Sequence, residues 1–200
     1  MQKIMFNDKY GLTKAVLAKR KTQTRRIITN KEMLEIIRNF DYPSSFFLNP
    51  DLRKKFINNR RVMRYQENET VAIAQSYKDI HAEILKFGLD FLKLKKEFLQ
   101  SKGYTNKMFV RAEYMPHAIR ITNIRIERLQ DISEADSLKE GILRGYDVGL
   151  DRTTYWYHGL ANSSFRTPQE AYASLIDRIS GKGTWESNPY VFVYDFELID

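Results

Sequence analysis

The stretch Lys21-Thr-Gln-Thr-Arg-Arg-Ile-Ile28 predicts a β-strand and carries several residues suited to chemistry. Its β-branched residues stand first at alternate and then at adjacent positions, which is typical of strands. Alternation predicts one face with Thr22, Thr24 and Arg26 and another with Lys21, Gln23 and Arg25. Hydroxyl groups flanked by fixed cations suit an anion or a developing oxyanion.

This stretch belongs to a window that holds the whole charge excess of the chain. The 200 residues include 33 Lys plus Arg and 25 Asp plus Glu, which gives a net charge of +8. From Lys9 to Lys31 there are eight basic residues and no acidic one, so 25 of each sign remain elsewhere. A local window predicts a site for a nucleotide or a few phosphates rather than a surface for a duplex. The alternative is a solvated helix face and strand edge.

Length and composition restrict the class of protein. The length predicts a single domain, or one domain with a large insertion, and 42% hydrophobic residues suffice for a core. The absence of cysteine excludes a disulfide scaffold, a thiol nucleophile and a cysteine-ligated metal. No apolar run approaches about 18 residues, and the N-terminus lacks a secretory signal. We therefore expect a cytoplasmic protein that does not contact membranes.

Patterns outside the central stretch predict a mixed α+β fold with at least four strands. Strands are expected at 4–6, 21–28, 70–74, 119–129 with a bulge near Thr122-Asn123, and 190–198. Helices are expected at 11–20, twice within 31–64, within 80–101, from Ser133 to Gly141, and from Thr167 to about Ile179. The three histidines stand too far apart to share a metal-ligand spacing, so we expect neither a metal nor a cofactor.

Glu140 stands in the last turn of the helix expected to end at Gly141, where the helix dipole disfavours a negative charge. This position favours the protonated form of the carboxyl group, which suits a general acid. The alternative is a surface glutamate beside Lys139 and Arg144.

The segment Thr153-Thr-Tyr-Trp-Tyr-His158 is an aromatic cluster that we expect to be a loop. Trp156 would stack on a nucleobase there, or the cluster would cover an open end of the core.

Three further blocks of the chain carry a shared pattern: Ala15-Val-Leu-Ala-Lys-Arg-Lys-Thr-Gln-Thr-Arg-Arg26, the stretch 119–141, and the stretch 181–196. In this order they resemble the ASCH domain family, the activating-signal-cointegrator homology group of PUA-like β-barrels. The last block looks like the closing strand of phage-borne and prophage-borne members. The resemblance implies a small mixed β-barrel with flanking helices and a cleft that binds RNA or nucleotides. It implies one ASCH-like domain over 1–200, with a mainly helical insertion at about 31–107.

Some small bacterial members of this family are amidohydrolases that remove the acetyl group of 4-acetylcytidine. Their catalytic lysine, threonine and glutamate match Lys21, Thr24 and Glu140, and their motif arginine matches Arg26. The match implies that Thr24 is the nucleophile, that Lys21 is its base, and that Glu140 protonates the leaving nitrogen. The residues expected to bind substrate are Arg20, Thr22, Arg25, Arg26 and Trp156. The chain departs from the family at Lys19, where glycine is usual.

A different hypothesis is a non-catalytic RNA- or nucleotide-binding module of phage origin, and a third is a phage accessory protein that binds a host protein through its insertion. Binding alone gives no reason for Glu140 in an anion-binding cleft, whereas acid catalysis does. Side chains of Lys21, Thr24 and Glu140 near hydrogen-bond reach would favour catalysis, and separations above ~10 Å would favour binding.

Overall fold

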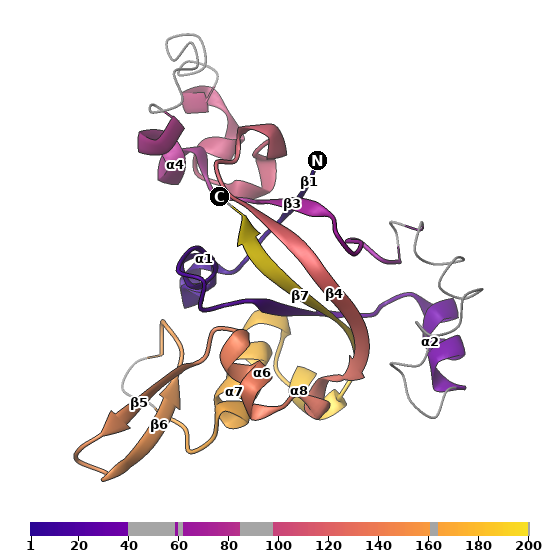
Figure 1. Cartoon of the computed structure of the whole chain (residues 1–200), viewed down its shortest axis with the longest axis vertical. Helices are drawn as coiled ribbons and strands as arrows, with labels where there is room; N and C mark the ends of the chain where they lie inside the picture. The colour runs from indigo at the N-terminus through magenta and orange to yellow at the C-terminus, as the bar shows by residue number, and fades with distance from the viewer. Residues whose placement is uncertain (40–58, 60–61, 85–97, 161–163, 200) are drawn as a thin grey trace.

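The computed structural model has a mixed α+β fold built on one five-stranded sheet (Figure 1). It describes residues 1–39, 59, 62–84, 98–160 and 164–199. The sheet order is β1-β3-β4-β7-β2, in which β1 runs parallel to β3 and the other neighbours are antiparallel. Its strands are β1 (Gln2–Ile4), β2 (Gln23–Ile27), β3 (Thr70–Ile73), β4 (Ala118–Arg128) and β7 (Tyr190–Ile199).

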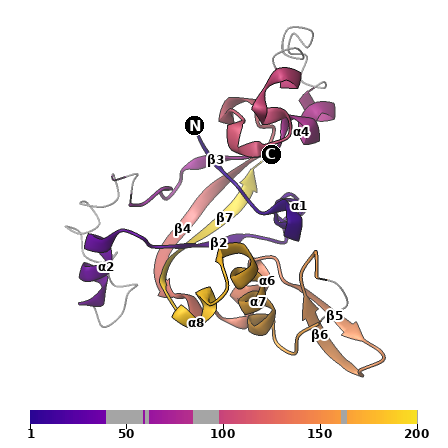
Figure 2. The same cartoon turned by 180° about the vertical axis from the view of Figure 1, so that it is seen from behind.

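A separate hairpin of two strands, β5 (Leu143–Asp147) and β6 (Arg152–Trp156), extends away from the sheet (Figures 1 and 2). Within the described residues the main sheet is not a closed barrel, because β1 and β2 are its edges. The PUA-like assignment therefore stays a prediction.

The described helices lie around the sheet. They are α1 (Leu12–Leu17), α2 (Lys31–Arg38), α4 (Tyr77–Ile84), α6 (Glu134–Lys139), α7 (Pro168–Ser180) and α8 (Thr184–Ser187). In both views α6, α7 and α8 lie together beside β2, whereas α4 lies at the opposite end of the molecule (Figures 1 and 2). Short 3-10 turns lie at Asp8–Tyr10, Lys102–Tyr104, Lys107–Phe109, Ala112–Tyr114 and Leu129–Asp131. None of the described helices is long and apolar enough to cross a membrane.

The core has two parts, both rich in β-branched and aromatic side chains. The larger part joins β4 and β7 to α7 through buried residues such as Ile121, Ile126, Val193 and Leu175. The smaller part lies around α4 and contains Tyr77, Ile80, Phe98, Val110 and Met115. The first part positions the site described below.

Several predicted elements are confirmed. The bulge in β4 lies between Ile121 and Asn123. Ser133 accepts a hydrogen bond from the N–H of Asp136 at the start of α6. Thr167 and Glu170 form a reciprocal capping box at the start of α7. These features are confirmed because they depend on local sequence.

The expectation of a loop at 153–158 is wrong, since Arg152–Trp156 forms β6. Its threonine and aromatic residues favour a strand, and Leu143–Asp147 supplies the partner.

The expected strand at 4–6 is displaced to Gln2–Ile4. The range 31–107 contains β3, which lies inside the sheet between β1 and β4. The second helix expected within 31–64, and much of the one expected within 80–101, lie outside the described residues.

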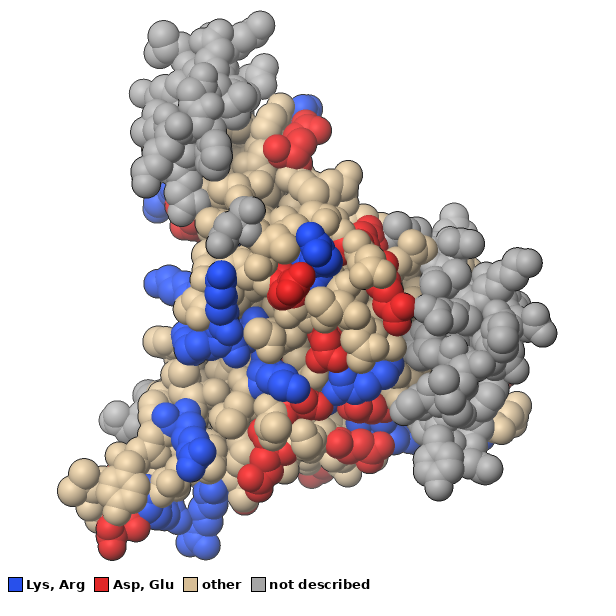
Figure 3. Space-filling model, in the orientation of Figure 1, with Lys and Arg blue, Asp and Glu red and all other residues tan. Residues whose placement is uncertain are grey.

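Figure 3 shows basic and acidic side chains interspersed on one face of the molecule. Lys and Arg gather over α1 and along the β5–β6 hairpin, while Asp and Glu are mixed with Lys and Arg over β4 and β7. Over the sheet, the described part of this face is therefore not uniformly basic.

Candidate active site

Lys21 is buried and contacts Glu140 directly. Its Nζ lies 2.5 Å from Glu140 Oε2, and the two side chains are only 2% and 5% exposed. Nζ also donates to the backbone oxygens of Gln23 and Glu140, at 2.8 Å each. All three N–H donors of the ammonium are therefore satisfied. The two residues, 119 positions apart in the chain, form one unit.

Two local turns bring this pair together. After α1, Lys19 adopts a left-handed φ of 57°, and the N–H groups of Arg20 and Lys21 both donate to the oxygen of Ala15, at 2.9 and 3.0 Å. Glu140 caps the C-terminus of α6, and Gly141 follows with a φ of 105°. The two turns are joined because the N–H of Thr22 donates to the oxygen of Lys139 at 3.0 Å. The start of β2 is thereby held against the end of α6.

A cavity of about 230 Å³ lies beside β2 and contains all three predicted catalytic residues. Its polar wall includes Lys21, Thr24, Arg25, Arg26, Glu140 and Tyr172, and its apolar wall includes Phe6, Leu12, Leu175, Ile27 and Ile179. The last two side chains are each 38% exposed, so part of the wall reaches the surface. A space of this size is smaller than the pockets that enclose a whole drug-sized ligand, and suits an acyl group with its amide.

Residues of β2, an edge strand of the described sheet, line this cavity. Phe196 N–H donates to Thr22 O, and Ile28 N–H donates to Tyr190 O. These two bonds show which alternate residues of β2 direct their backbone groups toward β7. The backbone groups of Arg25 and Ile27 then point away from β7, toward the open edge. Both residues line the cavity. The backbone N–H groups of two residues in the cavity wall therefore point away from β7.

Arg25 connects Glu140 to further carboxylates. Its Nη1 lies 3.2 Å from Glu140 Oε1, and its Nη2 lies 3.0 Å from Glu127 Oε2 and 3.5 Å from Asp136 Oδ2. It also donates to the side-chain oxygen of Gln23. Its Nε is buried without a hydrogen-bond partner among the described residues. Arg25 thus fixes the side of Glu140 that Lys21 does not contact.

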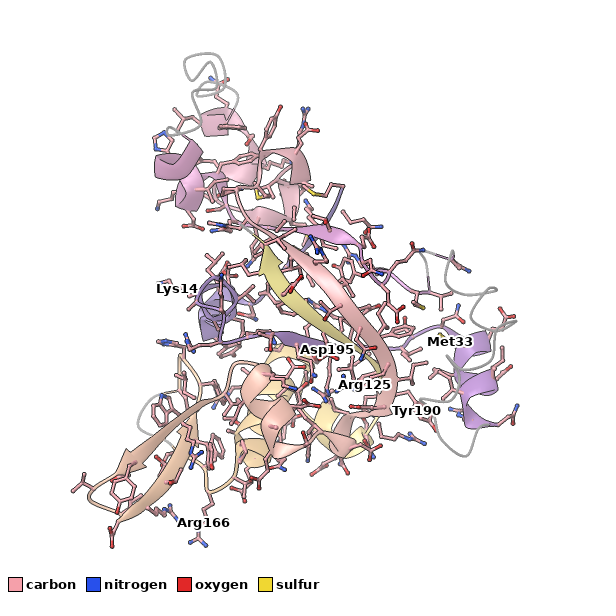
Figure 4. All side chains as sticks on the ribbon, in the orientation of Figure 1. Lys14, Met33, Arg125, Arg166, Tyr190 and Asp195 are labelled. Atoms are coloured by element: carbon pink, nitrogen blue, oxygen red, sulfur yellow. The ribbon has the colours of Figure 1, made fainter. Side chains whose placement is uncertain are left out.

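Arg125, on β4, contacts two of the same carboxylates, although β7 separates β4 from β2. Its guanidinium lies 2.5 Å from Glu127, 2.7 Å from Asp136 and 2.6 Å from Asp195. Figure 4 shows Arg125 and Asp195 close together on the central strands, beside α6. We call the following set the charge network: Lys21, Arg25, Arg125, Lys139, Glu127, Asp136, Glu140 and Asp195. It contains equal numbers of cations and carboxylates, so two charges of the basic window are neutralised internally.

Burial shifts the proton affinity of two groups in the cavity. Burial lowers the pKa of Lys21, although Glu140 opposes this through its charge and its hydrogen bond. Arg26 and Arg25 lower the pKa of Lys21 further. Burial, followed by the charge of Glu140, holds the pKa of the Tyr172 phenol well above its usual value. Tyr172 therefore stays protonated and retains an O–H donor.

The remaining sequence-predicted binding residues lie in different places. Arg26 lines the cavity, is exposed, and donates to the oxygen of Met5 at 2.9 Å. Arg20 is exposed and Thr22 is half-buried, and neither lines the cavity. Trp156 lines a different hollow, with Tyr146 and Thr154 on the hairpin. The structure does not bring Trp156 together with Lys21.

Sequence reasoning missed Tyr172, Arg125 and Glu127. Arg125 and Glu127 occupy alternate positions of a strand that was predicted, so their shared face was available as a signal. Tyr172 lies on the buried side of α7, where its spacing from Pro168 and Ile176 indicates only a core residue.

Among the residues that the structure describes, no group of three or more His, Cys, Asp or Glu side chains could hold a metal ion. Comparison of the chain with protein-family models, with curated proteins and with solved structures found no match.

Proposed function

We propose that this chain is an ASCH-like amidohydrolase that removes an acyl group from an amine of a nucleoside, such as 4-acetylcytidine. The observation that carries the proposal is the shared cavity, which holds the contacting pair Lys21 and Glu140 together with Thr24. Acyl transfer needs a nucleophile, a base and an acid around one reacting carbon, and these residue types supply them.

The first step requires an unprotonated base beside Thr24. Burial lowers the pKa of Lys21, and its contact with Glu140 gives the Lys21 proton a direct path to the carboxylate. Transfer along this contact produces a neutral amine and a neutral carboxylic acid. Thr24 Oγ1 then attacks the acyl carbon while Lys21 accepts its proton, which forms a tetrahedral intermediate.

The second step requires an acid and an oxyanion site. Glu140 donates its proton to the leaving nitrogen, the C–N bond breaks, and Thr24 carries the acyl group as an ester. At this point Lys21 is again an ammonium and Glu140 again a carboxylate. Water then attacks the acyl carbon of the ester and the bond to Thr24 Oγ1 breaks; one water proton restores the Thr24 hydroxyl, and the acyl group leaves as a carboxylate with release of the other proton. We assign oxyanion stabilisation to the edge N–H groups of Arg25 and Ile27. Arg26, an exposed residue of the cavity wall, binds the substrate.

The proposal includes a PUA-like origin for the sheet. Such a barrel would close where β2 approaches the segment that follows β1. The hydrogen bond from Arg26 to the oxygen of Met5 spans this opening. The first cavity lies at the same opening, since Met5, Arg26 and Thr24 all line it. This placement supports a cleft at the mouth of the barrel as the site of reaction.

Release of cytidine and acetate from 4-acetylcytidine tests the proposal. We expect Lys21→Ala and Glu140→Gln to lower kcat/KM by about 10²- to 10⁴-fold, the usual worth of acid–base catalysis. Thr24→Val should abolish turnover because it removes the nucleophile. Thr22→Val is the matched control and should retain activity, since Thr22 does not line the cavity. Wild-type rates in all three variants would disprove the mechanism.

The second candidate is a non-catalytic RNA- or nucleotide-binding module. The observation that favours it is the exposure of Lys14, Lys19 and Arg20 at and after α1, outside the charge network. It predicts affinity for short RNA that falls steeply with salt, with no turnover of any acylated nucleoside.

A further inference from the structure

Tyr172 lies on α7 with its side chain inside the protein, and it lines the cavity beside β2. Only 2% of the residue is exposed. The ring is held on two sides: the ring of Trp185 meets it edge-on with a centroid separation of 6.3 Å, and Cζ of Arg25 lies 6.0 Å from its centroid. These contacts fix the orientation of the ring, and with it the direction in which the hydroxyl group points.

The hydroxyl group of Tyr172 makes no hydrogen bond to any residue that the structure describes. Tyr157 on the neighbouring side of α7 is different, because it is 1% exposed and its hydroxyl pairs with Ser174 Oγ at 2.9 Å. Buried hydroxyl groups nearly always have a partner, since an unpaired buried polar group costs free energy. The unpaired hydroxyl in the cavity wall therefore marks a position where a ligand supplies the partner.

The ligand atom that meets this hydroxyl is an acceptor. Burial, followed by the charge of Glu140, holds the pKa of the Tyr172 phenol well above its usual value, so the group keeps its proton and donates it. The two carboxylate oxygens of Glu140 already accept from Lys21 and Arg25, at 2.5 and 3.2 Å. Because these two cations are paired, the position suits an uncharged carbonyl oxygen better than an anion.

We propose that Tyr172 is a ligand-binding residue whose hydroxyl donates to the carbonyl oxygen of the acyl group. The inference rests on the proposed function for the identity of the ligand, and it names the contact by which the cavity distinguishes an acylated amine from a free one. The acyl oxygen gains negative charge in the tetrahedral intermediate, which strengthens this hydrogen bond. Tyr172 thus adds a side-chain donor to the backbone donors proposed above.

Isothermal titration calorimetry with 4-acetylcytidine and with cytidine tests the contact. Both ligands are titrated into Thr24→Val, which does not consume the ligand, and into Thr24→Val/Tyr172→Phe. The second substitution removes only the hydroxyl oxygen and keeps the ring. We expect it to weaken the binding of 4-acetylcytidine about 3- to 10-fold, the usual value of one hydrogen bond between uncharged groups. Cytidine lacks the acyl oxygen, so its affinity should stay unchanged.

Tyr157→Phe is the matched control, since Tyr157 is equally buried but does not line the cavity. It should lower the urea midpoint of unfolding, because a hydrogen bond within the protein is lost, and should leave kcat/KM unchanged. In the otherwise wild-type protein, Tyr172→Phe should do the opposite. Its urea midpoint should stay unchanged, while kcat/KM for 4-acetylcytidine falls by about 10²-fold, the usual loss when one oxyanion donor is removed.

The outcomes separate this contact from the enzymatic proposal. Equal affinity for 4-acetylcytidine with and without Tyr172→Phe would overturn the contact, and the amidohydrolase would stand if turnover persists. Equal weakening of 4-acetylcytidine and cytidine would overturn it too, because the hydroxyl would then meet the base or the sugar. Binding that depends on Tyr172, without turnover by the wild type, would support the contact and contradict only the amidohydrolase. Failure of 4-acetylcytidine to bind or react would contradict both.

Discussion

Lys21 Nζ lies 2.5 Å from Glu140 Oε2 in the interior of the protein, although the two residues are 119 positions apart. The contact is made possible by the backbone hydrogen bond from Thr22 to Lys139, which joins β2 to the end of α6. Two buried charges lose their hydration, and their mutual attraction and hydrogen bonds offset that loss. The same contact therefore affects both the stability and the chemistry of the site.

Removal of one partner should destabilise the protein strongly. We expect Lys21→Met to lower the free energy of unfolding by about 3 kcal/mol, because the buried carboxylate of Glu140 loses its closest partner. The value is at the lower end of the range for buried pairs, since Arg25 still contacts Glu140. Urea-induced unfolding of the wild type and the variant measures it.

The double variant Lys21→Met/Glu140→Gln is the control for a direct interaction. The double variant should lose less free energy of unfolding than Lys21→Met and Glu140→Gln lose together. The difference should be about 0.5–3 kcal/mol, the usual coupling energy of contacting residues. Additive costs would show that the two side chains do not stabilise each other.

The pKa of Lys21 should depend on Glu140. Burial lowers this pKa below the ordinary value of 10.5, and the carboxylate raises it in part. Glu140→Gln removes the negative charge that raises the pKa of Lys21, so this pKa should fall further. A titration followed by the ¹⁵N shift of the lysine Nζ measures it. Glu127→Gln is the matched control, since Glu127 contacts Arg25 rather than Lys21, and it should leave the pKa close to that of the wild type.

The lowered pKa of Lys21 also makes stability depend on pH in a defined direction. Between the folded pKa of Lys21 and 10.5, the unfolded chain binds this proton while the folded protein has released it. The free energy of unfolding therefore rises with pH in this window. We expect the stability difference between the wild type and Lys21→Met to widen as the pH approaches 10.5. A constant or narrowing difference in urea unfolding would contradict the lowered pKa.

Arg125 should matter more for stability than an exposed arginine of the same strand. Arg125→Met leaves Glu127, Asp136 and Asp195 facing one another without this cation, and we expect a loss of about 3 kcal/mol. Arg120→Met is the control, because the Arg120–Glu197 pair is about half exposed on both sides and should contribute less than about 1 kcal/mol. Thermal and urea unfolding compare the two. Similar losses in both variants would show that the charge network contributes little.

The elements that sequence predicted well are those that local patterns determine. The alternating isoleucines of β4 and the cap at Thr167 require no knowledge of distant residues. The hairpin was missed because β6 needs β5 as its partner, and a threonine-rich aromatic segment alone does not identify one. Trp156 was misplaced for the same reason.

The site was predictable only in part. Lys21, Thr24 and Glu140 were singled out by their local patterns, the family resemblance joined them into one catalytic set, and the structure brings them to one cavity. The charge network was not found, because its partners are selected by sheet order: Asp195 is next to Arg125 only because β7 lies beside β4. The alternation of residues along a strand predicts which face of the sheet a side chain lies on. It does not predict which other strand will lie beside it.

Lys19 offers a test of backbone strain beside the site. Its φ is 57°, a left-handed conformation that costs a side-chain-bearing residue about 1–2 kcal/mol relative to glycine. Glycine loses more entropy on folding, by about 0.5–1 kcal/mol, so we expect Lys19→Gly to stabilise the protein by about 0.5–1 kcal/mol overall. Lys19→Ala should change stability little, because it keeps the strain.

Ala18→Gly is the neighbouring control. Ala18 has an ordinary φ of −85°, so glycine there should destabilise the protein. Urea unfolding of the three variants measures the effects. Stabilisation by Lys19→Ala equal to that by Lys19→Gly would assign the effect to lost charge in the basic window, and not to the left-handed turn that positions Lys21.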